Sequence, residues 1–236
     1  MVDSSGESDV AQALAEAARS MAVRGNPDDT LEAIAVAARE AVPGFNHVCV
    51  TVVGADGAVT TMAATSDLVR DLDALQYELD EGPCLSAVRD EQLVLAQNLA
   101  GDERWPRYVP RAAEAGIRSQ MAVRLLADEE VLGSLNFYST VRDTIDPEAF
   151  HRASLFATHA SLALGYSRRL EVMHASARTH RLIGQAIGML VERYEIEDER
   201  AFYYLVRVAS AGGLELRDVA REVVAQGNRR AGQDAS

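Results

Sequence analysis

Lysine is absent from this chain of 236 residues, so all 23 basic side chains are arginine. A phosphate-binding loop of the Gly-x-x-x-x-Gly-Lys-Ser/Thr type requires a lysine, and this class of nucleotide-binding site is therefore excluded. Only two cysteines are present, Cys49 and Cys84, too few for a disulfide framework or a cysteine metal cluster. The Gly-x-Ser-x-Gly motif of a hydrolase is also missing. We expect a protein that is not an enzyme.

Long apolar segments are equally scarce. No uninterrupted apolar run approaches the roughly 18 residues of a membrane-spanning helix. The first residues, Met-Val-Asp-Ser-Ser-Gly-Glu, are acidic and polar, unlike a signal peptide. The histidines lack metal-ligand spacing, since His174 and His180 would lie on different faces of a helix. These absences predict a cytoplasmic protein with no membrane contact and no metal site.

The net charge of −13 is unevenly distributed along the chain. Residues 1–167 hold 12 arginines and 26 acidic residues, a net charge of −14, whereas residues 168–236 hold 11 arginines and 10 acidic residues, a net charge of +1. A nearly neutral C-terminal region with arginines on chosen faces is compatible with a nucleic-acid partner.

Hydrophobic periodicity predicts helices and strands in a mixed order after an N-terminal extension. Residues 1–27 form that extension, with an alanine-rich helix at Val10–Val23. The predicted strands are His47–Val53, Val59–Ala64, Leu93–Ala96, Met121–Leu126 and Val131–Tyr138. The predicted helices are 28–42, Leu68–Leu79, a short helix after Gly82-Pro83, and Glu103–Ala115. Strand hairpins between helices indicate an α+β domain, in which helices flank an antiparallel sheet.

A long helix is predicted from Pro147 to Tyr194, joining this region to the last part of the chain. Two rows of residues along it repeat every seven positions: Phe156, Ala163, Leu170, Ala177, Gly184 and Val191, and three residues behind them His159, Tyr166, Met173, His180, Ile187 and Tyr194. Packing against the sheet explains the first half of this seam equally well. The middle, Ala163–His180, has no other obvious partner, so a parallel two-stranded coiled coil and a homodimer are expected there.

The end of the long helix separates into two faces. Ile183, Ile187, Leu190 and Tyr194 are expected on the core side, and Arg178, Arg181, Gln185 and Gly188 on the other. A glycine among arginines leaves bare backbone that a phosphate or a splayed base can approach. Tight packing of another helix against Gly188 is the alternative explanation.

Two shorter amphipathic helices, Glu199–Ala211 and Leu214–Ala225, complete a three-helix bundle. The residues expected to face inward are Ala201, Phe202, Leu205, Val208, Ala209, Leu216, Val219, Ala220 and Val223. The residues left outside are Tyr203, Arg207, Ser210, Arg217 and Arg221. Arginine can fork onto phosphates and tyrosine can stack on bases, although a solvated surface would show the same pattern.

Three motifs in this region, Gln185-Ala186-x-Gly188-x-Leu190, Glu199-Arg200-Ala201-Phe202-x-x-Leu205 and Leu216-x-x-Val219-Ala220, resemble the ANTAR family of RNA-binding antiterminator domains. The resemblance covers about 168–230 and implies an ANTAR domain at 167–230 that holds tandem stem-loops of a nascent leader transcript. Many members carry a lysine where this chain has Ile187, which leaves RNA contact to neighbouring arginines. The residues expected to act in RNA binding are Arg178, Arg181, Gln185, Gly188, Arg193, Tyr203, Arg207 and Arg217, with Ala186 setting close helix packing.

The run Leu75-Gln76-Tyr77-Glu78-Leu79-Asp80-Glu81-Gly82-Pro83-Cys84 and the segment Leu132-Gly133-Ser134-Leu135-Asn136-Phe137-Tyr138 resemble GAF domains, in particular those that precede ANTAR modules in actinobacteria. The resemblance implies a GAF sensor domain at 28–166 that binds an unidentified small molecule or mediates dimerisation. The Asn-Lys-x-Asp-Glu type motif of cyclic-nucleotide binders is missing. Candidate pocket residues are Tyr77, Cys84, Trp105 and Tyr108.

These patterns leave two other functions open. A dimeric scaffold without RNA would use Tyr203 and Tyr204 as anchors for a protein partner. A redox or haem sensor would act through a histidine or through Cys84, whose thiol pKa a helix N-terminus would lower. A small buried side chain is the competing interpretation of Cys84.

Overall fold

The computed structural model describes residues 27–234, so the predicted N-terminal helix at Val10–Val23 lies outside the described residues. Two compact units make up the chain, and the boundary between them falls between Ser167 and Arg168. One continuous helix, α6 (Pro147–Tyr194), contributes residues to both units, as predicted. None of the described helices is long and apolar enough to cross a membrane.

The first unit contains a five-stranded antiparallel sheet in the order β2-β1-β5-β4-β3. Its strands are β1 (His47–Val53), β2 (Val59–Ala64), β3 (Leu93–Ala96), β4 (Ser119–Ala127) and β5 (Glu130–Ser139). All five predicted strands are confirmed, and the β4–β5 hairpin turns at Asp128 and Glu129, both with positive φ. Two successive residues of positive φ suit the right-handed twist of a two-residue hairpin, which explains the tight connection.

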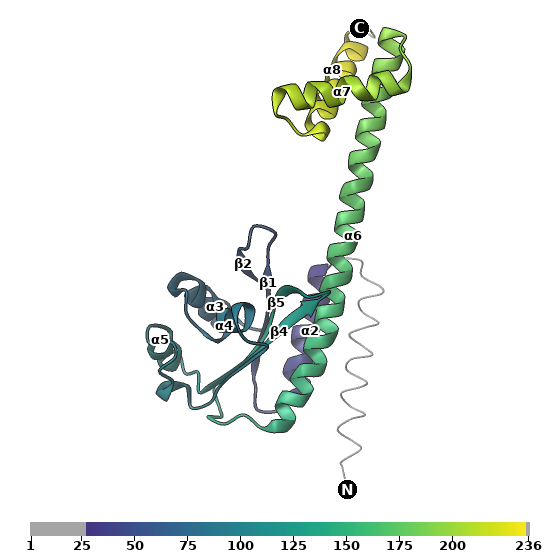
Figure 1. Ribbon diagram of the computed structural model, residues 1–236. Coiled ribbons are helices and arrows are strands. Elements are labelled where there is room, and N and C mark those ends of the chain that lie inside the picture. The colour runs from purple at the N-terminus through teal and green to yellow at the C-terminus, as the bar shows by residue number, and fades with distance from the viewer. Residues whose placement is uncertain (1–26, 235–236) are drawn as a thin grey trace. The chain divides into compact units, whose positions relative to one another are not determined.

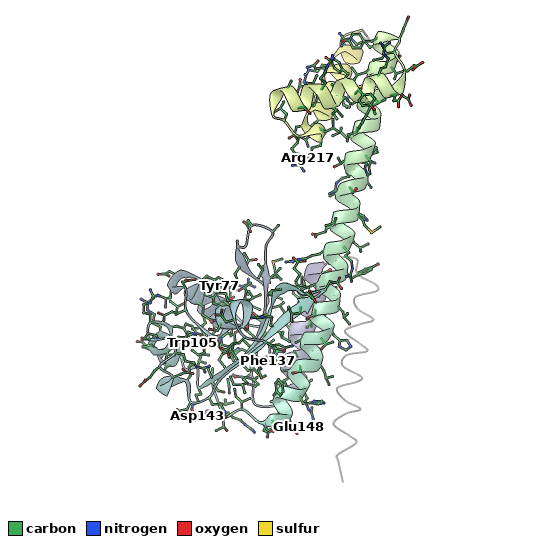
Figure 2. The ribbon with its side chains drawn as sticks, in the orientation of Figure 1. Tyr77, Trp105, Phe137, Asp143, Glu148 and Arg217 are labelled. Carbon is green, nitrogen blue, oxygen red and sulfur yellow. The ribbon has the colours of Figure 1, made fainter. Side chains whose placement is uncertain are left out.

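Helices cover both faces of the sheet in this unit (Figure 1). On one face lie α2 (Pro27–Ala41) and the first part of α6, and on the other lie α3 (Asp67–Leu79), α4 (Pro83–Arg89) and α5 (Tyr108–Glu114). The first face has an apolar core that includes Val48, Val50, Met121, Leu135 and Phe137. Phe137, which is labelled in Figure 2, belongs to this core together with residues of α6.

The first half of the predicted heptad seam packs into this apolar core. Phe156 is fully buried there, and Ala163 packs against the core from its edge. This is the alternative that the sequence left open, because a helix that covers a sheet needs the same apolar spacing as a coiled coil. The second row does not pack there, because Tyr166 is 61% exposed.

The helix predicted at Glu103–Ala115 is shorter in the structure and begins only at Tyr108. Proline disfavours helical backbone in the residue before it, so Pro106 keeps Trp105 out of the helix. The preceding residues form the 3₁₀ helix η1 (Leu99–Gly101), which ends at the extended residue Asp102, and then turns at 103–104 and 106–107. The aromatic ring of Trp105 is thereby directed by a loop and not by a helix.

The second unit packs the end of α6 against α7 (Asp198–Gly212) and α8 (Leu216–Asp234). Its buried residues are Ala186, Leu190, Ala201, Leu205, Ala209, Val219 and Ala220, four of them alanines. Small side chains allow the helices to approach closely, and this three-helix arrangement agrees with the prediction.

Three residues of this unit that were predicted to face the core are exposed, so these predictions were wrong. Phe202 is 39% exposed, Val208 is 38% exposed and Tyr194 is 54% exposed. A bundle of three short helices gives each helix only a narrow buried stripe, and side chains at the margin of that stripe find no fourth element to cover them. The exposed face of α7 is therefore wider and more aromatic than the periodicity suggested.

Candidate functional site

The second face of the sheet carries a set of fully buried polar side chains beside an apolar core of its own. The buried polar cluster consists of Cys49, Thr51, Asp73, Gln76, Cys84, Gln120, Ser134, Asn136 and Tyr138, all fully buried. The alternation of β1 and β5 places the strand members of this cluster opposite the first apolar core, since successive side chains on a strand point to opposite faces. The sheet therefore carries an apolar core on one face and, on the other, the buried polar cluster beside a second apolar core that includes Val69, Leu99 and Val109.

Asp73 of α3 is the centre of the buried polar cluster. Its Oδ2 accepts hydrogen bonds from Thr61 at 2.8 Å and from Cys49 at 2.9 Å, and its Oδ1 accepts one from the hydroxyl of Tyr138. The Gln76 amide donates to the same Oδ1 at 3.3 Å. Burial raises the pKa of Asp73, although these donors lower it in part. All of these partners are uncharged groups.

The four predicted pocket residues all lie on this face of the sheet, and the labels of Tyr77 and Trp105 mark its α3–α5 side in Figure 2. The Tyr77 hydroxyl lies 3.0 Å from that of Thr51 and 2.9 Å from that of Thr61. The Tyr108 hydroxyl donates to Gln120 Oε1 at 2.8 Å. These contacts link Tyr77 of α3 and Tyr108 of α5 to the sheet, so both residues lie near the same face.

Cys84 is fully buried, with its sulfur 3.4 Å from both Thr51 Oγ1 and Ser134 Oγ. Burial raises the pKa of this thiol to about 12, outweighing any effect of the short helix α4 that begins beside it. A redox-sensing cysteine needs an exposed thiol of lowered pKa. The small buried side chain is therefore the correct interpretation of Cys84.

Sequence reasoning missed Asp73, Gln76, Thr51 and Asn136 as members of this cluster. One signal was available for the first two, because Asp73 and Gln76 fall on the same side of α3 as the buried Val69 and Leu72. A carboxylate on the apolar face of an amphipathic helix rarely lies buried without a partner. Such a residue indicates a polar site beneath the helix.

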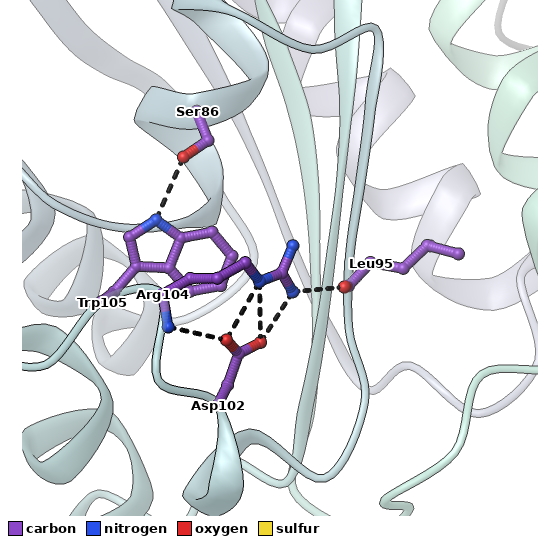
Figure 3. Close-up of polar contacts among 5 residues, drawn as sticks. All are labelled: Ser86, Leu95, Asp102, Arg104 and Trp105. Carbon is purple, nitrogen blue, oxygen red and sulfur yellow. Dashed lines mark hydrogen bonds and ion pairs between the residues drawn. The ribbon is translucent and has the colours of Figure 1, made fainter.

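The segment that leads into α5 is held in place by a second set of contacts (Figure 3). The indole nitrogen of Trp105 donates to Ser86 Oγ at 3.0 Å, and the Arg104 guanidinium lies over the indole ring at 4.3 Å from its centroid. Arg104 also pairs with Asp102 and donates to the carbonyl of Leu95. These bonds hold the loop against α4 and β3.

A second ion pair fixes the start of α5 to the loop between α3 and α4. Arg107 Nε lies 2.6 Å from Glu81 Oε1, and the Arg107 backbone amide donates to Glu81 Oε2 at 2.9 Å. The hydrogen bond from Arg107 holds the pKa of Glu81 below its usual range. We call residues Asp102–Glu114 the cover segment, because their buried side chains pack onto this face of the sheet and Tyr108 bonds Gln120 of the cluster.

A groove of about 580 Å³ lies elsewhere in this unit, between α6 and the β3–β4 edge of the sheet. Its lining residues include Leu93, Val123, Phe150, Ser161 and Leu162. None of the four predicted pocket residues belongs to it. In the part of the chain that the structure describes, no group of three or more histidine, cysteine or acidic residues is arranged to hold a metal ion.

The predicted polar stripe in the second unit is exposed. Arg178, Arg181, Gln185 and Gly188 all face solvent on α6. A Cβ added to Gly188, or to the neighbouring Gly184, would meet no atom within 4 Å. The alternative that Gly188 permits tight packing of another helix therefore has no support among the described residues. Gly188 therefore leaves exposed helix backbone near Arg181.

The other residues predicted for this surface are exposed as well, with one exception. Arg193, Arg207 and Arg217 are exposed, and Tyr203 is 64% exposed. Ala186 is fully buried between the helices. It cannot touch a bound molecule, and its contribution is the close packing that holds the stripe in place.

Family models match both regions of the chain. The family model of the GAF domain matches residues 25–165. The chain belongs to the GAF domain family. The ANTAR domain model matches residues 171–224, so a GAF domain is followed by an ANTAR domain. Both are regulatory and not catalytic domains, which fits the expectation for this chain. No curated protein matches it significantly.

Solved structures share the fold of the GAF domain at low sequence identity. The GAF domain of a phosphoenolpyruvate-protein phosphotransferase from Coxiella burnetii is 15% identical with a TM-score of 0.55, covering 70% of this chain and 97% of that one. The phytochrome photosensory core module of Stigmatella aurantiaca is 11% identical with a TM-score of 0.57, covering 85% and 44%. The chromophore-binding domain of the bacteriophytochrome RpBphP3 from R. palustris is 12% identical with a TM-score of 0.51, covering 70% and 64%.

The buried carboxyl of the GAF domain leads to a pH prediction. Because burial raises the pKa of Asp73 above 3.8, its contribution to the free energy of unfolding is fully present below that pH and is lost as the pH rises through the folded-state value. The asparagine side chain of Asp73→Asn is uncharged at every pH. The stability of Asp73→Asn relative to the wild type should therefore increase with pH in urea titrations. A difference that stays constant with pH would contradict this.

Proposed function

We propose that this chain is a regulator of transcription antitermination that binds RNA through its ANTAR domain and receives a signal through its GAF domain. The ANTAR domain would hold tandem stem-loops of a nascent leader transcript in the cytoplasm and so prevent a terminator hairpin from forming. The observation that carries this proposal is the exposed stripe of Arg178, Arg181, Gln185 and Gly188 on a matched ANTAR domain.

The chemistry of the stripe suits folded RNA. Arginine forks onto phosphate oxygens and stacks on unpaired bases, and glycine lets a strand approach the helix backbone. Around the same unit, Tyr203 presents an exposed ring on α7, while Arg193 lies 5.2 Å from the ring centroid of Tyr194. Glu192, four residues after Gly188 on the same side of α6, places a negative charge at the end of the stripe.

We also propose that two copies associate through α6. Four of its exposed apolar side chains, Leu155, Leu162, Tyr166 and Met173, recur at intervals of seven, four and seven residues. This is the spacing of a coiled-coil seam: Tyr166 and Met173 belong to the predicted row that begins at His159, and Leu155 and Leu162 lie one position before the row that begins at Phe156. A parallel pair would present two RNA-binding surfaces, which fits a target with two stem-loops.

The proposed seam predicts a change in subunit number. Met173→Glu should convert the dimer to a monomer, because two carboxylates would face each other across an apolar seam. Ala175→Glu adds the same charge two residues away on an exposed position and should leave the dimer intact. Light scattering after size-exclusion chromatography distinguishes the two. A wild type that elutes as a monomer at micromolar concentration would remove this part of the proposal.

A filter-binding titration tests RNA binding directly. The full chain should retain a tandem stem-loop RNA more tightly than the single stem-loop or a duplex DNA of equal length. Affinity should fall as salt rises, because phosphate contacts release counterions. Equal retention of all three nucleic acids would contradict stem-loop recognition.

The second candidate is a protein scaffold, favoured by the exposed rings of Phe202, Tyr203 and Tyr204 on α7. Aromatic side chains are common anchors of protein interfaces. Absence of RNA binding in the same titration, with an intact dimer, would favour this function over antitermination.

A further inference from the structure

Asp73 lies inside the GAF domain without a counter-charge. Its side chain is fully buried, and its hydrogen-bond partners are the hydroxyls of Thr51, Thr61 and Tyr138, the Gln76 amide and the thiol of Cys49. None of these groups is a cation, and no arginine or histidine of the described residues forms an ion pair with it. An ionised carboxylate in such a place is costly, and proteins keep one mainly where it meets a charged partner.

Two further polar atoms in the same layer lack partners. Asn136 Oδ1, an acceptor, and Gln120 Nε2, a donor, are buried and form no hydrogen bond with any described residue. Asn136 lies beside Thr51, Cys49 and Cys84, to all of which its amide nitrogen is bonded. Unpaired buried atoms of this kind are rare in folded proteins, and a bound water, ion or small molecule is one explanation for them.

We propose that the buried polar cluster of the GAF domain binds a small protonated amine, with Asp73 as its counter-ion. An ammonium group carries one positive charge and donates several hydrogen bonds. The cluster offers it the Asp73 carboxylate, the unpartnered Asn136 carbonyl oxygen and the hydroxyls of Thr51, Thr61 and Ser134. An anionic ligand would be repelled by Asp73.

The cover segment provides a route for such a ligand. Its ion pair to another segment, Arg107 with Glu81, has one partner whose side chain is more than half exposed to solvent, whereas the pair of Arg104 with Asp102 lies within the cover segment. Exposed ion pairs contribute little to stability, so the free energy of opening the cover segment is set mainly by exposing its buried side chains, among them Trp105 and Tyr108. Trp105 and Tyr108, on the inner side of this segment, would move with it.

This inference rests on the proposed role of the GAF domain as the signal input and names the chemical class of that signal. Binding of an amine would fix Asp73 in its charged form and draw the hydroxyls around it inward. These hydroxyls belong to β1, β2 and β5, and the opposite face of the same strands supports α6. Occupancy of the cluster is thereby linked to the packing of α6 within this unit.

Trp105 makes the inference measurable, because it is the only tryptophan of the chain and lies on the cover segment. We would titrate the full chain with methylammonium chloride at constant ionic strength and follow tryptophan emission. So small a probe binds in the millimolar range at best, and the titration should therefore extend to about 100 mM. A saturable change in emission is expected from the wild type.

Matched variants assign the response to the cluster. Asp73→Asn should abolish it, and Asp71→Asn, which alters an exposed acid on the same helix, should leave it unchanged. Should Asp73→Asn fail to fold, Thr61→Val carries the test, because loss of one hydroxyl should weaken methylammonium binding about fivefold. Thr60→Val, on the exposed side of β2, is its control and should bind as the wild type does.

Three results would overturn the inference: no saturable change in the wild type, an equal change in Asp73→Asn, or an equal change when potassium chloride replaces methylammonium. The last would indicate a site for alkali-metal cations. Because the titration contains no RNA, a negative result leaves the antitermination proposal standing. Conversely, methylammonium binding in a protein that retains no RNA would contradict antitermination alone.

Discussion

Arg181→Ala combined with Arg207→Ala should lower the affinity for tandem stem-loop RNA about 100-fold, since a hydrogen bond to a charged group contributes roughly 1.5 kcal/mol or more and each arginine supplies at least one. Both side chains are exposed, one on α6 and one on α7, and neither supports the hydrophobic core of its unit. The loss should therefore appear in binding and not in folding.

The salt dependence gives a sharper readout than affinity alone. Removing two phosphate contacts should flatten the plot of log affinity against log salt by one to two charges. Arg70→Ala combined with Arg111→Ala removes the same charge from exposed positions of the GAF domain and should leave the slope unchanged. A double Arg181/Arg207 variant with the wild-type slope would place these residues outside the RNA interface.

Leu205→Ala should unfold the ANTAR domain or leave it only marginally stable. Leu205 is fully buried in α7, where it packs with Ala186, Leu190 and Ala201. Truncation of a buried leucine to alanine destabilises by about 2–5 kcal/mol, which is a large share of the stability of so small a bundle. RNA binding should be lost while the GAF domain remains folded.

Thermal unfolding monitored by circular dichroism and by Trp105 emission separates these effects, because the tryptophan reports only the GAF domain. The helical signal should melt early in Leu205→Ala, whereas the tryptophan transition should keep its wild-type midpoint. Val208→Ala, which removes two methyl groups from a half-exposed position on the same helix, should change little. Simultaneous loss of both transitions would show that the two units do not unfold independently.

Much of the fold could be predicted because each element carries a strong local pattern. The alternation at His47–Val53 and the 48-residue helical run from Pro147 to Tyr194 are set by neighbouring residues alone. Predictions failed where a boundary depended on a single backbone restriction, as at Pro106, or where burial depended on how many helices surround a position, as at Phe202 and Val208.

The candidate sites differ in the same way. The ANTAR stripe follows from the helical period of one segment, so the sequence alone is enough to place Arg181, Gln185 and Gly188 on one face. The buried polar cluster joins residues that are distant in sequence: Asp73 meets Tyr138 across 65 positions, and Asn136 meets Cys49 across 87. Only the sheet topology brings these side chains together, and no local pattern encodes it.

The two unlike faces of the sheet have an evolutionary consequence. Along β5, Leu135 and Phe137 face the apolar core that packs against α6, while Ser134, Asn136 and Tyr138 face the side that holds the buried polar cluster. Substitutions in the second set would change the polar cluster, while the first set keeps the packing of α6. Related domains would thus diverge in this cluster at alternate positions of a strand without changing how the long helix is held.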